Sequence, residues 1–112
     1  MYDLEIRTNG ANAPPRAFAG LNKKIVRTER CFLIGDLHSA AQEAGAWIKQ
    51  YNWSIGSDGV FMTNLAGQQT NSQMARPVVL YSTAGTKNVT LTVTDSNGRS
   101  NSHTIQVVVV DP

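Results

Sequence analysis

Apolar and polar side chains alternate along much of the chain, most regularly over residues 88–94. One side of this stretch carries Val89, Leu91 and Val93, and the other side carries threonines. A period of two is typical of a strand with one face in a hydrophobic core, so we predict that these three side chains are core residues. Turn-forming residues follow at 95–98, and residues 103–110 predict the strand that completes a hairpin.

Shorter segments of the same kind precede this hairpin. β-Branched and aromatic side chains are concentrated in four segments, at residues 24–28, 31–34, 47–55 and 78–81. In the third segment Tyr51 and Trp53 fall on one side, and we expect both in the core, with Trp53 as its central plug. Cys31 has the same parity as the predicted core residue Leu33, so we expect a buried, unreactive thiol.

One segment departs from the strand pattern. Residues 39–44 are mostly good helix formers, Ser39 and Gln42 have the spacing of a capping box, and Gly45 can end a helix. We therefore expect a short helical turn near residues 39–45. About seven short strands separated by turn residues, with only one such turn, predict an all-β antiparallel sandwich.

Trp47 stands beside this turn, and its sequence position leaves two predictions open. Strict alternation would place it on the side of Tyr51 and Trp53, but it lies at the very beginning of the strand. It is either an exposed aromatic that stacks on a sugar or contacts a protein, or a side chain that packs under the helical turn.

The first 13 residues form a separate unit in the pattern. Apolar residues there alternate with charged ones, at Tyr2, Leu4 and Ile6. The Pro14–Pro15 pair follows, and proline fixes φ and removes a hydrogen-bond donor, so the alternation cannot continue through it. We expect residues 1–13 to be an arm or linker that docks on a neighbour, and residues 14–112 to be the sandwich domain.

Composition excludes several classes of protein. The single cysteine excludes an internal disulfide and a multi-cysteine zinc site. A net charge of +2 indicates no nucleic-acid partner, and no apolar run of 18 residues is present that would insert into a membrane. The N-terminus lacks the apolar segment of a secretory signal. This leaves open a small protein assembled in the cytoplasm or a piece of a longer exported protein.

Candidate chemistry is sparse. The two histidines, His38 and His103, have no partners at the spacing that a catalytic or metal site needs. A calcium loop beginning at Asp95 would need a carboxylate at its twelfth position, where Gln106 stands. We therefore predict no enzyme activity, no catalytic residue, no metal ligand and no cofactor.

A cluster of positive charge comprises Lys23, Lys24, Arg27 and Arg30, offset by Glu29. It would suit an acidic glycan, lipid or protein surface. The simpler interpretation, which we favour, is an edge strand whose basic side chains prevent pairing with other sheets.

The order of several spaced residues resembles the polycystic-kidney-disease (PKD) domain family. The resemblance covers residues 14–110 and rests on Pro15–Gly20, Leu33-x-Gly35, Ile48-x-x-Tyr51-x-Trp53, Asp58–Gly59, Pro77-x-x-x-Tyr81-x-x-x-Gly85 and Val89-x-Leu91-x-Val93-x-Asp95-x-x-Gly98. The acidic loop that often precedes the Tyr-x-Trp strand in that family is replaced here by Ala40–Gly45, so no calcium role is carried over to this region. The resemblance implies an immunoglobulin-like β-sandwich.

The resemblance also implies a choice of functions. PKD-like domains are mostly extracellular or surface spacers, adhesion modules and accessory domains of secreted hydrolases, and related immunoglobulin-like domains decorate phage capsids and tails. Our first hypothesis is a non-catalytic attachment module, in the form of a small surface-displayed or virion decoration protein. The alternative is a spacer or carbohydrate-binding accessory domain of a secreted hydrolase or adhesin.

Both hypotheses expect a partner at a protein assembly or cell surface, with a glycan as a further candidate, and a location on a virion surface or outside the cell. We expect partner docking through the arm, the basic cluster and the exposed tryptophan, at Tyr2, Leu4, Ile6, Lys23, Lys24, Arg27 and Trp47.

Overall fold

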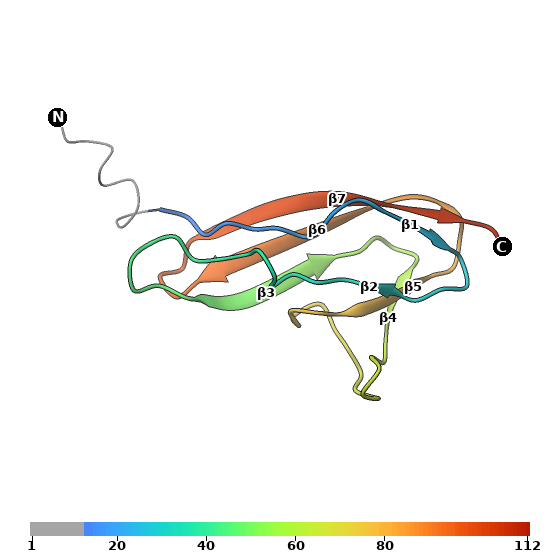
Figure 1. Ribbon diagram of the computed structural model, residues 1–112, viewed down its shortest axis with the longest axis horizontal. Coiled ribbons are helices and arrows are strands. Elements are labelled where there is room, and N and C mark those ends of the chain that lie inside the picture. The colour runs from blue at the N-terminus through green and yellow to red at the C-terminus, as the bar shows by residue number, and fades with distance from the viewer. Residues whose placement is uncertain (1–12) are drawn as a thin grey trace.

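The computed structural model describes residues 13–112, which form a sandwich of two β-sheets (Figure 1). Its strands are β1 (Lys23–Val26), β2 (Cys31–Phe32), β3 (Ile48–Ser54), β4 (Gly59–Met62), β5 (Val78–Tyr81), β6 (Gly85–Asp95) and β7 (Ser100–Val110). The larger sheet has the strand order β1-β7-β6-β3, and the smaller has the order β2-β5-β4. The predicted all-β, immunoglobulin-like sandwich is confirmed.

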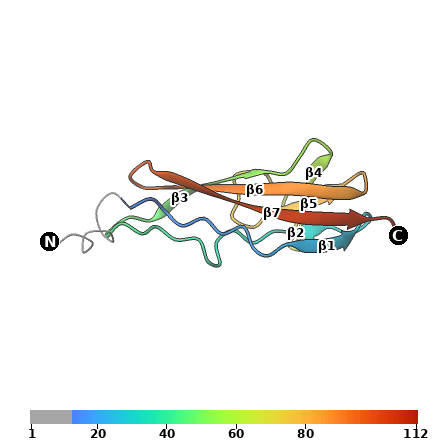
Figure 2. The same cartoon turned by 90° about the horizontal axis from the view of Figure 1, so that it is seen from above.

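The two ends of the described chain lie far apart. β1 lies parallel to β7, and the other paired strands are antiparallel. Figure 2 shows β1 and β2, which belong to different sheets, side by side along one long side of the sandwich. Residue 13 and the C-terminus lie at opposite ends of the domain (Figure 1).

The β6–β7 hairpin forms as its alternation predicts. Val89, Leu91 and Val93 are fully buried, and Ile105, Val107 and Val109 of β7 are buried beside them on the same face of the sheet. The turn between the strands is stabilised by Asp95, whose Oδ1 accepts hydrogen bonds from the backbone N–H groups of Asn97 and Arg99, both at 2.9 Å. Gly98 adopts a φ of 86° in this turn, a conformation that favours glycine.

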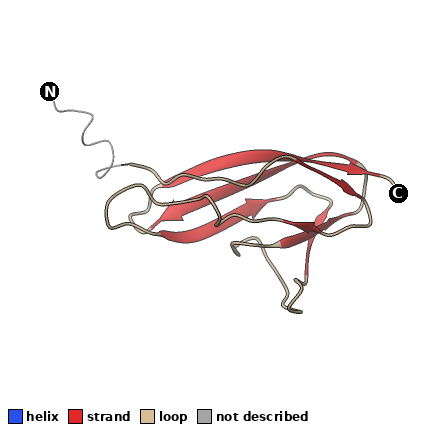
Figure 3. Cartoon of the chain, in the orientation of Figure 1, coloured by secondary structure: helices blue, strands red, loops and turns tan. Residues whose placement is uncertain are grey.

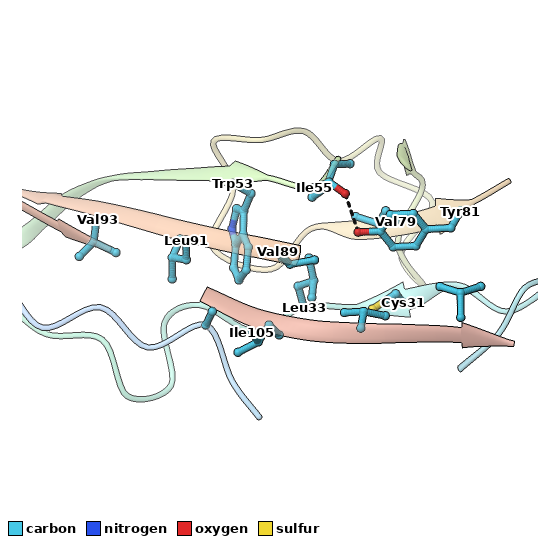
Figure 4. Close-up of a cluster of buried hydrophobic side chains, with 13 residues drawn as sticks. Cys31, Leu33, Trp53, Ile55, Val79, Tyr81, Val89, Leu91, Val93 and Ile105 are labelled. Carbon is cyan, nitrogen blue, oxygen red and sulfur yellow. Dashed lines mark hydrogen bonds between the residues drawn. The ribbon is translucent and has the colours of Figure 1, made fainter. Parts of the chain in front are cut away.

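Trp53 and Leu33 lie at the centre of the core between the two sheets, and Tyr51 is half-buried against its margin (Figure 4). Two aromatic side chains of the core have polar atoms that find partners there. Trp53 Nε1 donates to the carbonyl oxygen of Met74 at 2.9 Å, and the hydroxyl of Tyr81 donates to that of Ile55 at 2.7 Å. Each aromatic ring therefore ties its strand to a loop as well as filling volume.

The predicted helical turn near residues 39–45 is absent, because residues 13–112 contain strands and loops only (Figure 3). The Ser39 hydroxyl does not cap a helix: it accepts a hydrogen bond from the N–H of Phe18 at 2.9 Å and donates to the carbonyl of the same residue. Ala40 forms an antiparallel bridge with Arg16, with N–O distances of 2.7 and 3.0 Å. These contacts with a distant segment replace the local bonds of a helix.

Candidate functional site

The side of the sandwich near β1 and β2 carries large apolar side chains that are exposed to solvent. A groove of about 320 Å³ is lined there by Phe18, Leu21, Ile34 and Leu37, with Lys23 and His38 as polar neighbours. A second groove of about 350 Å³ is lined by Phe32, Ile34, Leu65 and Arg76, among others. Ile34 lines both grooves, so they form one continuous surface. We call this surface the apolar side and define it by Leu21, Phe32, Ile34, Leu37 and Leu65.

The alternation at β2 explains part of the apolar side. Cys31 and Leu33 point into the core, so Phe32 and Ile34 point outward, where they are 42% and 38% exposed. A strand that is apolar on both faces is normally covered on both. Leu65 is even more exposed, at 89%, on the loop that follows β4. Contiguous exposed apolar surface of this kind marks an interaction site.

The basic cluster lies next to the apolar side. Lys23, Lys24 and Arg30 line a third groove, which they share with Cys31 and Phe32. Because Phe32 also lines the second groove, the cations border the apolar side directly. The apolar side therefore suits a partner that combines apolar with acidic side chains.

β1 is an edge strand, as the interpretation that we favoured requires, and an acidic residue protects part of its edge. β1 is an outer strand of its sheet, and Glu29 closes its free edge: the carboxylate accepts a hydrogen bond from the N–H of Val26 at 2.7 Å, and Glu29 N donates to Val26 O. Arg27 forms an ion pair with Asp111 at 2.7 Å. The role of Glu29 was missed by sequence reasoning, which treated it only as a charge offset.

The two histidines support the segment that leads into β1. His103 Nδ1 accepts a hydrogen bond from the N–H of Ala19 at 2.9 Å, which requires a neutral imidazole. Phe18 stacks on His103 with a centroid distance of 5.1 Å and meets His38 edge-on at 5.5 Å. The structure therefore brings together two histidines that the sequence did not connect, and it gives them a packing role.

No group of three or more His, Cys, Asp or Glu side chains that could hold a metal ion is found within residues 13–112. Cys31 is buried, and burial raises the pKa of its thiol despite the nearby charge of Lys23. No helix able to cross a membrane occurs in this part of the chain.

Asp58 and Lys87 form an ion pair that joins the β3–β4 turn to β6. Asp58 Oδ2 accepts hydrogen bonds from Lys87 Nζ at 2.8 Å and from the hydroxyl of Thr83 at 2.6 Å. These hydrogen bonds, that of Lys87 first, lower the pKa of Asp58 from 3.8 to about 2. These partners of the Asp58 carboxylate all lie within the domain, so we assign the ion pair a role in stability.

Trp47 is 61% exposed, in agreement with one of its two predictions. The alternative, packing under a helical turn, is wrong because that turn does not form. Strict alternation also fails, since a β-bulge between Ile48 and Gln50 shifts the register by one residue. Ile48 packs against the core, and Trp47 is left outside it.

The outer face of the larger sheet, to which Trp47 is adjacent, is polar over β3, β6 and β7, and it is uncharged there apart from Lys49 in the bulge of β3. Its hydroxyl groups pair across the β6–β7 hairpin, with oxygen–oxygen distances of 2.7 to 2.8 Å, in the pairs Thr90–Thr104, Thr92–Ser102 and Thr94–Ser100. The predicted docking residues Tyr2, Leu4 and Ile6 lie outside the described residues.

A family model and several solved structures identify one family. The family model described as "PKD domain" matches residues 12–110. The PKD1 domain of Vibrio anguillarum Epp is similar at 25% identity with a TM-score of 0.62, covering 90% of this chain and 99% of that one. The PKD1 domain of the Vibrio cholerae metalloprotease PrtV is 28% identical with a TM-score of 0.53, covering 89% and 99%.

The PKD domain of the KIAA 1837 protein superposes with a TM-score of 0.63 at 22% identity, covering 85% of each chain, which supports the fold alone. None of the curated proteins matches the chain.

Proposed function

Because the chain belongs to the PKD domain family, whose domains are generally non-catalytic modules, we propose that it attaches to a larger protein assembly through its apolar side. The observation that carries this proposal is the exposure of that surface. Leu21, Leu37 and Leu65 are 76%, 63% and 89% exposed, whereas Leu33 and Leu91 are buried in the core. Burial of such side chains in an interface gains roughly 25 cal/mol for each Å² of apolar surface removed from water.

The basic cluster borders the same surface, and the sequence of the arm offers further docking residues. Lys23, Lys24 and Arg30 border the apolar side, and the arm at residues 1–13 carries Asp3 and Glu5 between apolar residues. We propose that Tyr2, Leu4 and Ile6 bind a neighbouring subunit while the sandwich domain, residues 14–112, forms the rigid body. Arg27, which directly follows β1 and forms an ion pair with Asp111, takes part as the cation at the end of that strand.

We propose that the module is displayed on a particle surface, with virion decoration as its most specific form. An antibody against the chain tests this in purified particles and in culture supernatant from the native source. A free chain of 112 residues that sediments with particles supports the proposal. The same epitope found only in a much larger secreted polypeptide contradicts it.

Substitution of the apolar side makes the test specific. Leu37→Asp should abolish association with particles and leave the melting temperature unchanged, because Leu37 lies outside the core. The matched control is Val60→Asp, which replaces a residue that is 58% exposed and belongs to none of the three grooves. Equal binding of both variants would show that the apolar side is not the attachment surface.

A second candidate function is an accessory or spacer domain of a secreted hydrolase or adhesin. Two observations favour it: the similarity to the PKD1 domain of a metalloprotease, and the position of residue 13 and the C-terminus at opposite ends of the sandwich. A domain of that geometry holds its neighbours apart. The antibody experiment distinguishes the two candidates by the size of the polypeptide that carries the epitope.

A further inference from the structure

The outer face of the larger sheet carries a regular array of polar side chains. The register of β3 against β6 adds a third column to the hydroxyl pairs, because Ser54, Asn52 and Gln50 lie opposite Thr90, Thr92 and Thr94. The register of β6 against β7 places Thr104, Ser102 and Ser100 on the other side of the same threonines. With a rise of about 3.4 Å per residue and a strand spacing of about 4.8 Å, the array measures roughly 14 by 10 Å.

Charge is absent from this face over an area larger than the array. The outward positions beyond it on β6 and β7 are also uncharged, at Thr86, Asn88, Gln106 and Val108. Charged side chains begin only at its borders, with Lys49 in the bulge of β3 and Lys24 on β1. In an ordinary soluble domain about one surface position in three or four is charged. The central part of this sheet face is therefore less charged than an average protein surface.

The chemistry of the array favours a ligand that both donates and accepts hydrogen bonds. In each hydroxyl pair one O–H donates to the other oxygen, so the second O–H and the remaining lone pairs are free. The threonine side chains are β-branched and are held by their cross-strand partners, so binding would order them little further. An apolar protein surface laid on this face would leave its polar groups without partners.

Trp47 supplies an apolar platform at one end of the array. Its backbone is held by the turn after β6, since Ser96 N donates to Trp47 O at 2.7 Å and Trp47 N donates to Ser96 Oγ at 3.2 Å. This position continues the row of Gln50 and Thr94 beyond the bulge. An exposed aromatic ring beside a few placed hydroxyl and amide groups is the composition typical of a site for a partly apolar, hydroxyl-rich ligand.

From these observations we propose that the outer face of β3, β6 and β7, with Trp47 at its end, binds an extended, uncharged polysaccharide. The pyranose ring would stack on Trp47, and sugar hydroxyls would exchange hydrogen bonds with Gln50, Asn52 and the threonines. An uncharged polymer is favoured over an acidic one, because the hydroxyl and amide groups of the array itself carry no charge and the lysines lie only at its borders. This inference deepens the accessory-domain form of the proposed function and does not depend on the apolar side.

The test is co-sedimentation of the full chain with insoluble cellulose, chitin, xylan and mannan, and affinity electrophoresis in mixed-linkage β-glucan, with pectin as the charged comparison. We expect binding to at least one of the neutral polymers and none to pectin. Trp47→Ala should weaken that binding at least tenfold, and Thr92→Lys, which places a charge at the centre of the array, should abolish it.

Matched controls separate the array from general surface effects. Val60→Ala removes an exposed apolar side chain elsewhere, and Ser57→Lys adds a charge on a loop outside the face. Both should bind like the unmodified chain. Circular dichroism checks that the Thr92→Lys variant is folded. If it is not folded, the Trp47→Ala variant alone provides the test of polysaccharide binding.

Three outcomes would overturn the inference: no binding to any neutral polymer, binding that survives both Trp47→Ala and Thr92→Lys, or equal binding to pectin. Loss of particle association in Leu37→Asp with intact polysaccharide binding would show that the two surfaces act separately. Failure of both experiments would reject the attachment proposal and the glycan proposal independently.

Discussion

Gly35 and Trp53 permit a quantitative test of how the core is packed. A Cβ atom added at Gly35 would lie 2.7 Å from Cζ2 of Trp53 and 3.0 Å from both the carbonyl oxygen of Ala75 and Cδ2 of Leu91. Gly35 N also donates to that carbonyl at 2.8 Å, so the backbone cannot move away without losing a hydrogen bond. The methyl group of an alanine must therefore displace the indole ring or the loop.

We expect Gly35→Ala to destabilise the domain by about 1–2 kcal/mol. Overpacking a buried site costs about 1–3 kcal/mol, and the reduced freedom of the unfolded chain offsets this by about 0.4–1 kcal/mol. For a domain of this size the melting temperature should fall by roughly 4–12 °C. Differential scanning calorimetry measures that fall, and urea denaturation followed by circular dichroism measures the free energy of unfolding.

A double-mutant cycle with Trp53→Phe isolates the contact between the two residues. Phenylalanine lacks the ring carbon that the new methyl group would meet. In the Trp53→Phe background, Gly35→Ala should therefore cost at least about 1 kcal/mol less than in the unmodified chain. The same cost in both backgrounds, or a Gly35→Ala variant as stable as the unmodified chain, would refute this account of the packing.

Three further predictions concern the ion pair, the thiol and the buried phenol. The pKa of Asp58 is lowered from 3.8 to about 2, so its pairing with Lys87 stabilises the domain above pH 4 and is lost as the pH falls towards 2. Asp58→Asn should lower the melting temperature at pH 6 by an amount that disappears at the acid end; a constant difference contradicts this. Burial raises the pKa of the Cys31 thiol, so labelling by a disulfide reagent at pH 7 should require unfolding, and rapid labelling of the native protein would count against it. Tyr81→Phe removes the donor to Ile55 O and should cost about 1–2 kcal/mol in urea denaturation, whereas unchanged stability would show that water replaces the hydroxyl.

The two proposed surfaces lie on different parts of the same rigid body. The apolar side runs along β2 and the segment before β1, whereas the uncharged array covers the outer face of β3, β6 and β7. Such a division allows one domain to bind a protein on one surface and a polymer on another. Substitutions on either surface fall outside the core, so each can be tested without unfolding the domain.

Alternation along the chain was sufficient to predict the sandwich and most of its core. Val89, Leu91 and Val93 are fully buried because a regular strand turns every second side chain to the same face, and Trp53 lies between the sheets for the same reason. The turn at residues 95–98 could also be predicted from the local sequence, because it depends on Asp95 and Gly98. These features depend on residues that are close together in the sequence, so the packing of distant segments did not alter them.

What the sequence could not determine were the positions where distant segments compete with local preference. Ser39 has the chemistry of a helix cap, but its hydroxyl binds the backbone of Phe18. A single bulge between Ile48 and Gln50 changes the parity of the strand and leaves Trp47 outside the core. Phe32 and Ile34 have the pattern of ordinary members of an apolar strand, and they are exposed because no segment within residues 13–112 covers them. Period-two alternation reports one strand at a time, whereas exposure depends on what the other segments cover, and that is decided only when the sheets pack.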